Sequence, residues 1–187
     1  MTLRRFVSAS LLVAAPALAH AQAAIPLSPF SFTISAGALL PTGDASKSYN
    51  TGYQVGAAVD LSIPLSPIGF RGEVNYGSLN AKPSGGFTGD TKDFGGNLNV
   101  VYGLMQPIPF APKPYVTGGG SYSHISSSAT SGSTTISASS NHYGFNLGGG
   151  VDWTLAGFGV RLDARYRQIN GDGGSFKTIP ITFGIKF

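Results

Sequence analysis

A histidine and a serine two positions apart, His124 and Ser126, are the residues whose types and spacing best fit catalytic chemistry. In a serine hydrolase the imidazole takes the proton of the hydroxyl, and an acid on the same surface orients the imidazole. The only glutamate of the sequence is Glu73. This chemistry therefore requires Glu73 to lie beside His124, and the elements that carry the two residues decide whether it does.

A second possible chemistry is metal binding by His124 and His142, which flank a stretch rich in serine and threonine. A zinc site needs at least three protein ligands, and the sequence contains no cysteine that could add a thiolate. In a hairpin the spacing of the two histidines also predicts that they lie on opposite faces. We therefore expect no metal site and no cofactor.

Ten charged residues lie in segments that alternate between apolar and small or polar residues, and each takes a polar position. Five are acids and five are bases, so their charges balance. Charges that gather on one face, away from apolar side chains, predict a network of ion pairs in a narrow interior. The set comprises Asp60, Arg71, Glu73, Asp93, Asp152, Arg161, Asp163, Arg165, Arg167 and Lys186.

The last eleven residues show the pattern that organises the chain. Ile179, Ile181, Phe183, Ile185 and Phe187 take alternate positions, with small or polar residues between them. A period of two places these apolar side chains on one face of an extended strand. The same period recurs seven times earlier, although a run of glycines blurs it in the fifth segment. We predict an all-β chain of eight antiparallel strands, at residues 30–40, 53–63, 68–78, 93–104, 115–124, 143–155, 158–168 and 177–187.

The predicted connections alternate in length along the chain. Short turns are expected at residues 64–67, 106–114 and 156–157, and longer polar loops at 41–52, 79–92, 125–142 and 169–176. Such alternation is typical of an up-and-down transmembrane β-barrel, with short turns on the periplasmic side and long loops outside. The tight turns also set the register, which places Asp152 opposite Arg161 and Asp60 opposite Arg71.

The amino terminus has the layout of a secretory signal peptide. Arg4 and Arg5 precede an apolar run, and small residues at positions 19, 21 and 23 offer cleavage sites, of which we favour the one after Ala23. Residues 1–23 are then the signal peptide and residues 24–187 the barrel domain. Without the two arginines, ten bases face eight acids and the net charge is +2, so nucleic acid is not an expected partner.

The alternation alone also fits a soluble β-barrel or sandwich, in which the apolar face would point inward. Three observations favour a membrane. The polar face is rich in glycine and asparagine and its charges balance, which suits a crowded lumen better than a water-facing surface. The signal peptide supplies a route of export. Aromatic residues on the apolar face gather near the strand ends, as in the interfacial girdles of membrane barrels. They are Phe30, Phe70, Trp153 and Phe158 at the short-turn end and Tyr53, Tyr76, Phe94, Tyr122, Phe145 and Tyr166 at the other.

The chain resembles the small eight-stranded outer-membrane barrels of the OmpA/OmpX type. The resemblance covers the mature chain, and its sharpest motifs are Ala164-Arg165-Tyr166-Arg167 and the final strand that ends in Phe187. It implies a monomer in the outer membrane of a diderm bacterium, surrounded by outer-membrane lipid. It also implies that periplasmic chaperones and the outer-membrane assembly machinery are partners, and that Phe183, Ile185 and Phe187 form the assembly signal.

We expect a non-enzymatic protein that supports the membrane or binds an unknown surface ligand through its long loops. The first alternative is a narrow pore for ions or small solutes, gated by the luminal charges. The second is a lipid A hydrolase, because some outer-membrane barrels deacylate lipid A with a His-x-Ser motif and a glutamate. His124-Ile125-Ser126 is similar to that motif, but Ser127 replaces its asparagine, and Glu73 is expected to face the lumen rather than lipid.

Overall fold

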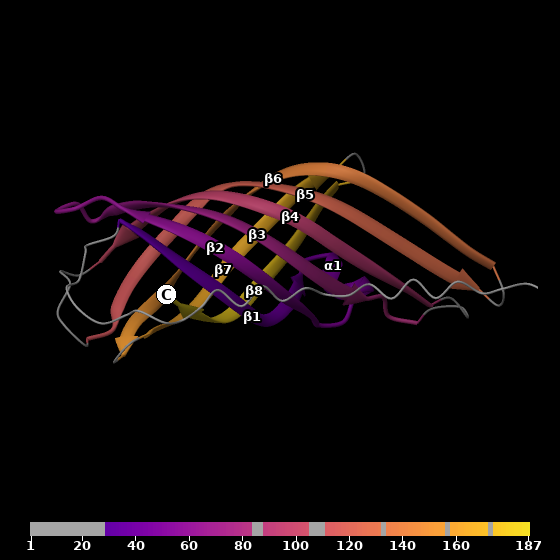
Figure 1. Cartoon of the computed structure of the whole chain (residues 1–187). Coiled ribbons are helices and arrows are strands. Elements are labelled where there is room, and N and C mark those ends of the chain that lie inside the picture. The colour runs from indigo at the N-terminus through magenta and orange to yellow at the C-terminus, as the bar shows by residue number, and fades with distance from the viewer. Residues whose placement is uncertain (1–28, 84–87, 105–110, 132–133, 156–157, 172–173) are drawn as a thin grey trace, which may run out of the picture.

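A computed structural model describes residues 29–83, 88–104, 111–131, 134–155, 158–171 and 174–187. The predicted signal peptide lies outside these residues. Eight strands form one closed barrel (Figure 1), which confirms the predicted fold class. The strands are β1 (Phe30–Thr42), β2 (Gly52–Ser62), β3 (Ile68–Asn80), β4 (Thr88–Gly103), β5 (Lys113–Ser131), β6 (Thr134–Leu155), β7 (Phe158–Gly171) and β8 (Gly174–Lys186).

Each strand pairs antiparallel with its neighbours in the sequence, and β1 pairs with β8 to close the barrel. The registers place Asp152 opposite Arg161 and Asp60 opposite Arg71, as the turns predict. The β7–β8 ladder is interrupted near Pro180 and resumes in the same register at Arg167 and Thr178. Proline has no N–H to donate, so the interruption is local and the register survives it.

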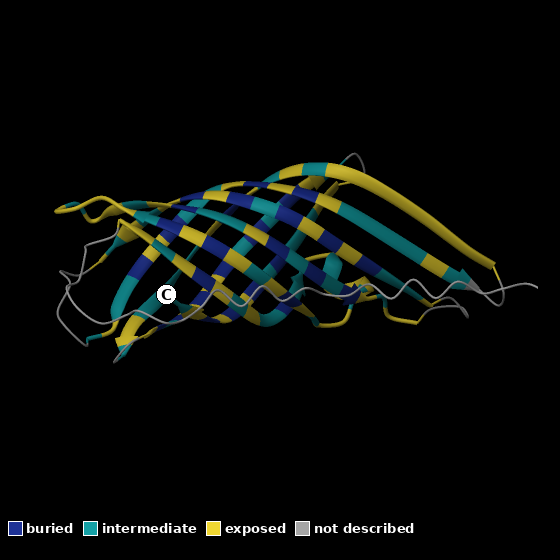
Figure 2. Cartoon of the chain, in the orientation of Figure 1, coloured by how far each residue is buried: buried dark blue, intermediate teal, exposed yellow. Residues whose placement is uncertain are grey.

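The barrel is polar inside and apolar outside. Figure 2 shows bands of buried and exposed residues that alternate along the strands, as the two-residue period requires. Most buried side chains are polar or charged, whereas large apolar side chains such as Phe32, Ile34 and Leu98 are exposed. A soluble barrel would show the reverse distribution, so the soluble alternative is wrong.

The prediction of a long loop at residues 125–142 is also wrong. β5 continues to Ser131, β6 begins at Thr134, and the two strands pair up to these residues. β4 pairs with β5 from Thr88 onward and with β3 up to Asp90, so β5 and β6 reach farthest beyond the rest of the barrel, with β4 beside them (Figure 1). Here we name residues 88–92, 125–131 and 134–142 the β4–β6 extension. Serine and threonine suggest a loop by composition, but threonine is β-branched and accepts strand geometry readily.

The other predicted long loops also differ from the structure. β7 and β8 continue to Gly171 and from Gly174, so most of residues 169–176 is strand. Residues 41–52 hold a short helix, α1 (Ala45–Ser48), which no helical period predicts. A hydrogen bond from Lys47 lowers the pKa of the exposed Asp44 before this helix. Among the described residues, no helix is long and apolar enough to cross a membrane.

Candidate functional site

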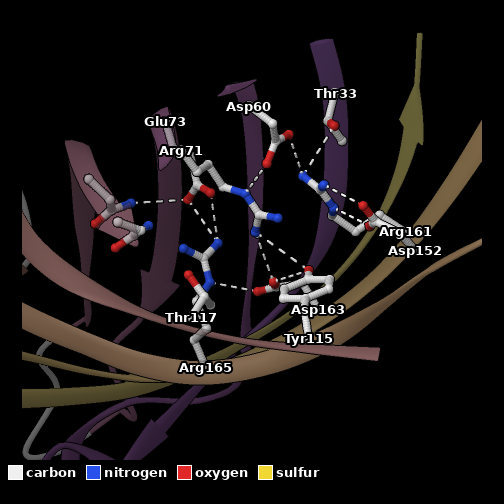
Figure 3. A network of polar contacts seen from close by, with 12 residues as sticks. Thr33, Asp60, Arg71, Glu73, Tyr115, Thr117, Asp152, Arg161, Asp163 and Arg165 are labelled. Atoms are coloured by element: carbon white, nitrogen blue, oxygen red, sulfur yellow. Dashed lines mark hydrogen bonds and ion pairs between the residues drawn. The ribbon is translucent and has the colours of Figure 1, made fainter. Parts of the chain in front are cut away.

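Eight of the ten predicted luminal charges form one chain of alternating sign. Figure 3 shows all of them except Lys186. The chain begins at the barrel end that carries the carboxy terminus, where Lys186 Nζ lies 2.8 Å from Asp152 Oδ2. Arg161 lies between Asp152 and Asp60, at 2.6 and 2.9 Å.

The chain continues from Asp60 into the middle of the lumen. Arg71 lies between Asp60 and Asp163, at 2.7 and 3.2 Å. Arg165 lies between Asp163 and Glu73, at 2.6 and 2.8 Å. Each interior charge of the chain therefore touches two charges of opposite sign.

This chain follows from strand alternation and barrel closure. Alternation turns the charged residues of β2, β3, β6, β7 and β8 inward, and an eight-stranded barrel is narrow enough for opposite walls to touch. Arg71 on β3 thereby reaches Asp163 on β7 across the lumen. Because an unpartnered buried charge costs about 3–5 kcal/mol, the four cations and four anions stabilise the barrel only as a complete set.

Tyr115 also belongs to the network, although it is not among the predicted luminal residues. Its hydroxyl donates a 2.6 Å hydrogen bond to Asp163 Oδ2, and its ring lies 4.9 Å from the Arg71 guanidinium carbon. The residue is buried. The alternation of the strand indicates this position, since Val116 and Tyr122 on the outer face imply that Tyr115 points inward.

The remaining two predicted charges, Asp93 and Arg167, form a separate buried ion pair farther along the lumen. Amide side chains lie between this pair and the chain, and Asn97 donates a 3.0 Å hydrogen bond to Glu73. A cavity of about 10 Å³ there is lined by Gln54, Asn146 and Arg167 among others. Gln54 Oε1, Asn146 Oδ1 and Arg167 Nε have no protein partner, so two acceptors and one donor border a space about the size of one water molecule.

Beyond the Asp93–Arg167 pair, the lumen becomes apolar. Leu39, Leu79 and Ile169 are almost completely buried on the inner faces of β1, β3 and β7. Tyr49 and Phe176 contact each other edge to face at 5.6 Å between ring centroids. The sequence does not predict this apolar layer, because Leu79 and Ile169 lie in segments that are expected to be loops.

The predicted aromatic girdle and assembly signal lie on the outer surface. All of these residues are exposed except Tyr76 and Tyr166, which are half-buried. Tyr76 packs against Tyr53, and Tyr166 packs against Phe145, at 6.4 and 6.3 Å between ring centroids. Tyr122 packs on Tyr143, an exposed tyrosine that the prediction omitted. Phe187 pairs through its backbone with Phe32, which ties the carboxy terminus to β1.

The structure separates the histidines from each other and from Glu73. The register pairs His142 with the buried Ser123, and His124 with the exposed Asn141, so the histidines lie on opposite faces. His124 Nδ1 lies 2.7 Å from Asn141 Oδ1, whereas Glu73 points into the lumen. Within the described ranges, no three side chains form a group that could hold a metal ion.

Comparison with known proteins places this barrel in a family. A family model described as "Outer membrane protein beta-barrel domain" matches residues 6–187, whereas no curated protein matches. Similar solved structures are Neisserial surface protein A (15% identity, TM-score 0.60, 85% of this chain and 96% of that chain), a major outer membrane protein of Thermus thermophilus (18%, 0.56, 84% and 98%), and Ail of Yersinia pestis (16%, 0.52, 84% and 97%). At these identities the likeness concerns the fold alone. The match over nearly the whole sequence shows that the chain belongs to the outer membrane protein beta-barrel domain family, as a small eight-stranded outer-membrane barrel.

Proposed function

We propose that this protein is a non-enzymatic surface-interaction protein that binds its partner through the β4–β6 extension. One observation carries the proposal. In the part of the chain that the structure describes, no strand pairs with the outer edge of β6 between Thr134 and His142, because β7 joins β6 only from Tyr143 onward. The backbone groups along this edge can therefore pair with an extended segment of another molecule.

The edge lacks the usual features that prevent such pairing. Natural edge strands are protected by charged side chains, proline or bulges. Residues 134–142 contain no charged residue and no proline or glycine. Every residue from Thr134 to Asn141 is exposed. These features favour a binding role over a purely structural one.

The partner is expected to come from outside the membrane rather than to be a second copy beside the first. Transmembrane strands tilt by about 35–45° from the membrane normal. Two copies in one membrane are related by an axis along that normal, so their tilted β6 edges would cross instead of running side by side. An edge-to-edge homodimer is therefore disfavoured, which agrees with the expected monomer.

The luminal geometry disfavours the two alternative functions. A pore would have to pass the fully paired charges and then the apolar layer of Leu39, Leu79 and Ile169. A lipid A hydrolase would need an acid beside His124, and this position holds Asn141 instead. We therefore assign a supporting role to the lumen and the binding role to the extension.

Family membership supports a proposal for the export and assembly of the chain. We propose cleavage after Ala23, passage with periplasmic chaperones, and insertion by the outer-membrane assembly machinery. The exposed outer-face position of Phe183, Ile185 and Phe187 supports their role as the assembly signal, and the apolar exterior supports outer-membrane lipid as the surroundings.

Ail of Yersinia pestis has been crystallised with the heparin analogue sucrose octasulfate. Such an anion is recognised by cationic side chains, and residues 125–142 of this chain contain no lysine or arginine. The one lysine of the β4 part of the extension, Lys92, lies 3.7 Å from Asp90. We therefore propose a neutral partner for the extension rather than a sulfated polysaccharide.

A peptide-display experiment tests the proposed function. A library of random peptides is panned against the mature protein in lipid nanodiscs, and against a variant in which Asn-Gly replaces residues 127–138. This variant closes the hairpin at the pair Ser126 and Ser139 with a two-residue turn, and heat-modifiable gel mobility checks that its barrel is intact. Peptides that bind the mature protein but not the variant with the shortened hairpin support the proposal. Enrichment that is equal for both proteins, or no enrichment, contradicts it.

A further inference from the structure

We infer that the partner segment of the β4–β6 extension is an uncharged strand in which apolar and polar residues alternate. This inference rests on the proposed function and specifies its partner. It starts from the two faces of the β6 edge. Ile136 and Ala138 lie on the face that turns toward the barrel mouth, whereas Thr135, Ser137 and Ser139 alternate with them on the other face.

The inner face of the extension forms one wall of a cleft of about 350 Å³. Its lining includes Ala81, Thr91, Ser127, Ile136 and Ala138, with Tyr49 opposite the extension. The volume lies within the range of natural ligand pockets, about 300–1,000 Å³. The cleft is therefore large enough to accept side chains of a bound segment.

Local contacts hold the cleft in shape. Tyr49 forms a β-bridge with Ala81 and a T-shaped contact with Phe176. Thr91 Oγ1 donates a 3.3 Å hydrogen bond to the Tyr49 hydroxyl and lies 3.0 Å from Ser127 Oγ. The tyrosine ring is thereby fixed against the strands of the extension, so the cleft does not need to form on binding.

A strand added to β6 would place alternate side chains beside Ile136 and Ala138, because residues opposite each other in a ladder share a face. Ile136 is 71% exposed and is the one large apolar side chain between Thr134 and His142. Apolar side chains on the partner would cover Ile136 and extend into the cleft. The intervening side chains would lie beside threonine and serine, where hydroxyls and amides find hydrogen-bond partners.

Charge restricts the partner further. The charged residues at the cleft are Lys82 and Asp90, and both already have partners. Lys82 Nζ donates a 2.7 Å hydrogen bond to the carbonyl oxygen of Ser46, and Asp90 accepts one from Ser128. A charged residue brought against the edge would lose water without gaining a counter-ion, so neutral segments are preferred.

Two blocked eight-residue peptides of equal composition test the inference. In one, valine and serine alternate, and in the other the valines are grouped in pairs. Binding to the protein in nanodiscs is measured by fluorescence anisotropy, with Ile136→Ser as the test variant and Ser137→Ala as the matched control on the opposite face. We expect the alternating peptide to bind about tenfold more tightly, and Ile136→Ser to remove most of this preference, since burying one such side chain accounts for about a factor of ten. The Ser137→Ala variant should stay within about twofold of wild type.

The outcomes separate this inference from the proposed function. Equal binding of the two peptides, or no binding of either, overturns the inference. If panning still yields peptides that need the full-length hairpin but lack alternation, the proposed function stands and only the partner chemistry is wrong. If the alternating peptide binds equally well after residues 127–138 are replaced, both proposals fail.

Discussion

Replacing Glu73 by alanine removes the last carboxylate of the luminal chain. Glu73 accepts hydrogen bonds of 2.9 and 2.8 Å from Arg165 and one of 3.0 Å from Asn97. After the replacement Arg165 keeps its 2.6 Å contact with Asp163, but the lumen carries one positive charge in excess.

The expected loss of stability can be worked from these contacts. Breaking a buried ion pair by removing one partner costs about 3–5 kcal/mol. The value should fall near the lower end, at about 3 kcal/mol, because Asp163 still neutralises part of the Arg165 charge. Adding Arg165→Met to Glu73→Ala restores neutrality, and the double variant should regain part of the lost stability.

Urea unfolding in lipid bilayers, followed by the fluorescence of Trp153, measures this effect, because the sequence contains a single tryptophan. Planar-bilayer conductance shows in addition whether the emptied position leaks small ions. Asp44→Asn serves as a control that removes an exposed carboxylate and should leave the unfolding midpoint unchanged. A wild-type midpoint together with wild-type conductance in Glu73→Ala would refute the reasoning that the charges plug and stabilise the lumen.

Four further predictions concern other parts of the barrel. Tyr115→Phe removes the 2.6 Å hydrogen bond to Asp163 and should lower the free energy of unfolding by about 1.5–3 kcal/mol; an unchanged urea midpoint would show that this hydrogen bond does not stabilise the barrel. Gly119→Ala should prevent folding, because a Cβ there would overlap the carbonyl oxygen of Leu98, whereas the neighbouring Gly120→Ala has open space and should fold as wild type; heat-modifiable mobility compares the two. Leu98→Arg places a charge on the lipid face at a side chain that is 77% exposed and should lower the free energy of unfolding by about 2–4 kcal/mol near the midplane. If Leu98→Arg and Leu98→Ala destabilise the barrel by the same small amount, the side chain of Leu98 does not face lipid. A high-resolution crystal structure should show one ordered water within hydrogen-bond distance of Gln54 Oε1, Asn146 Oδ1 and Arg167 Nε; a dry cavity or a direct bond among these groups would disprove it.

The strands could be predicted because lipid imposes a strict pattern. A misplaced charge on the outer face is costly, so each charge of the predicted set occupies an inward position, and the period of two remains visible throughout. The tight turns then determined which neighbours meet, as with Asp152 and Arg161. The face on which a strand residue lies and the register across a tight turn both depend on local geometry, which can be read from the sequence.

The contacts across the lumen could not be predicted in the same way. Arg71 meets Asp163, and Arg165 meets Glu73, from strands that are not neighbours. These contacts depend on strand tilt and on how the barrel closes, neither of which a hairpin reveals. The β4–β6 extension was missed for a different reason. Its serines suggest a loop by composition, although the alternation of Ile136 and Ala138 with hydroxyl residues already indicated a strand.

The apolar layer of Leu39, Leu79 and Ile169 gives the two mouths of the barrel unequal roles. At the opposite mouth, which carries the carboxy terminus, Lys186 remains 26% exposed, so water meets the chain of charges there directly. A change of pH or salt should therefore reach the ion pairs first at Lys186 and Asp152, and last at Glu73.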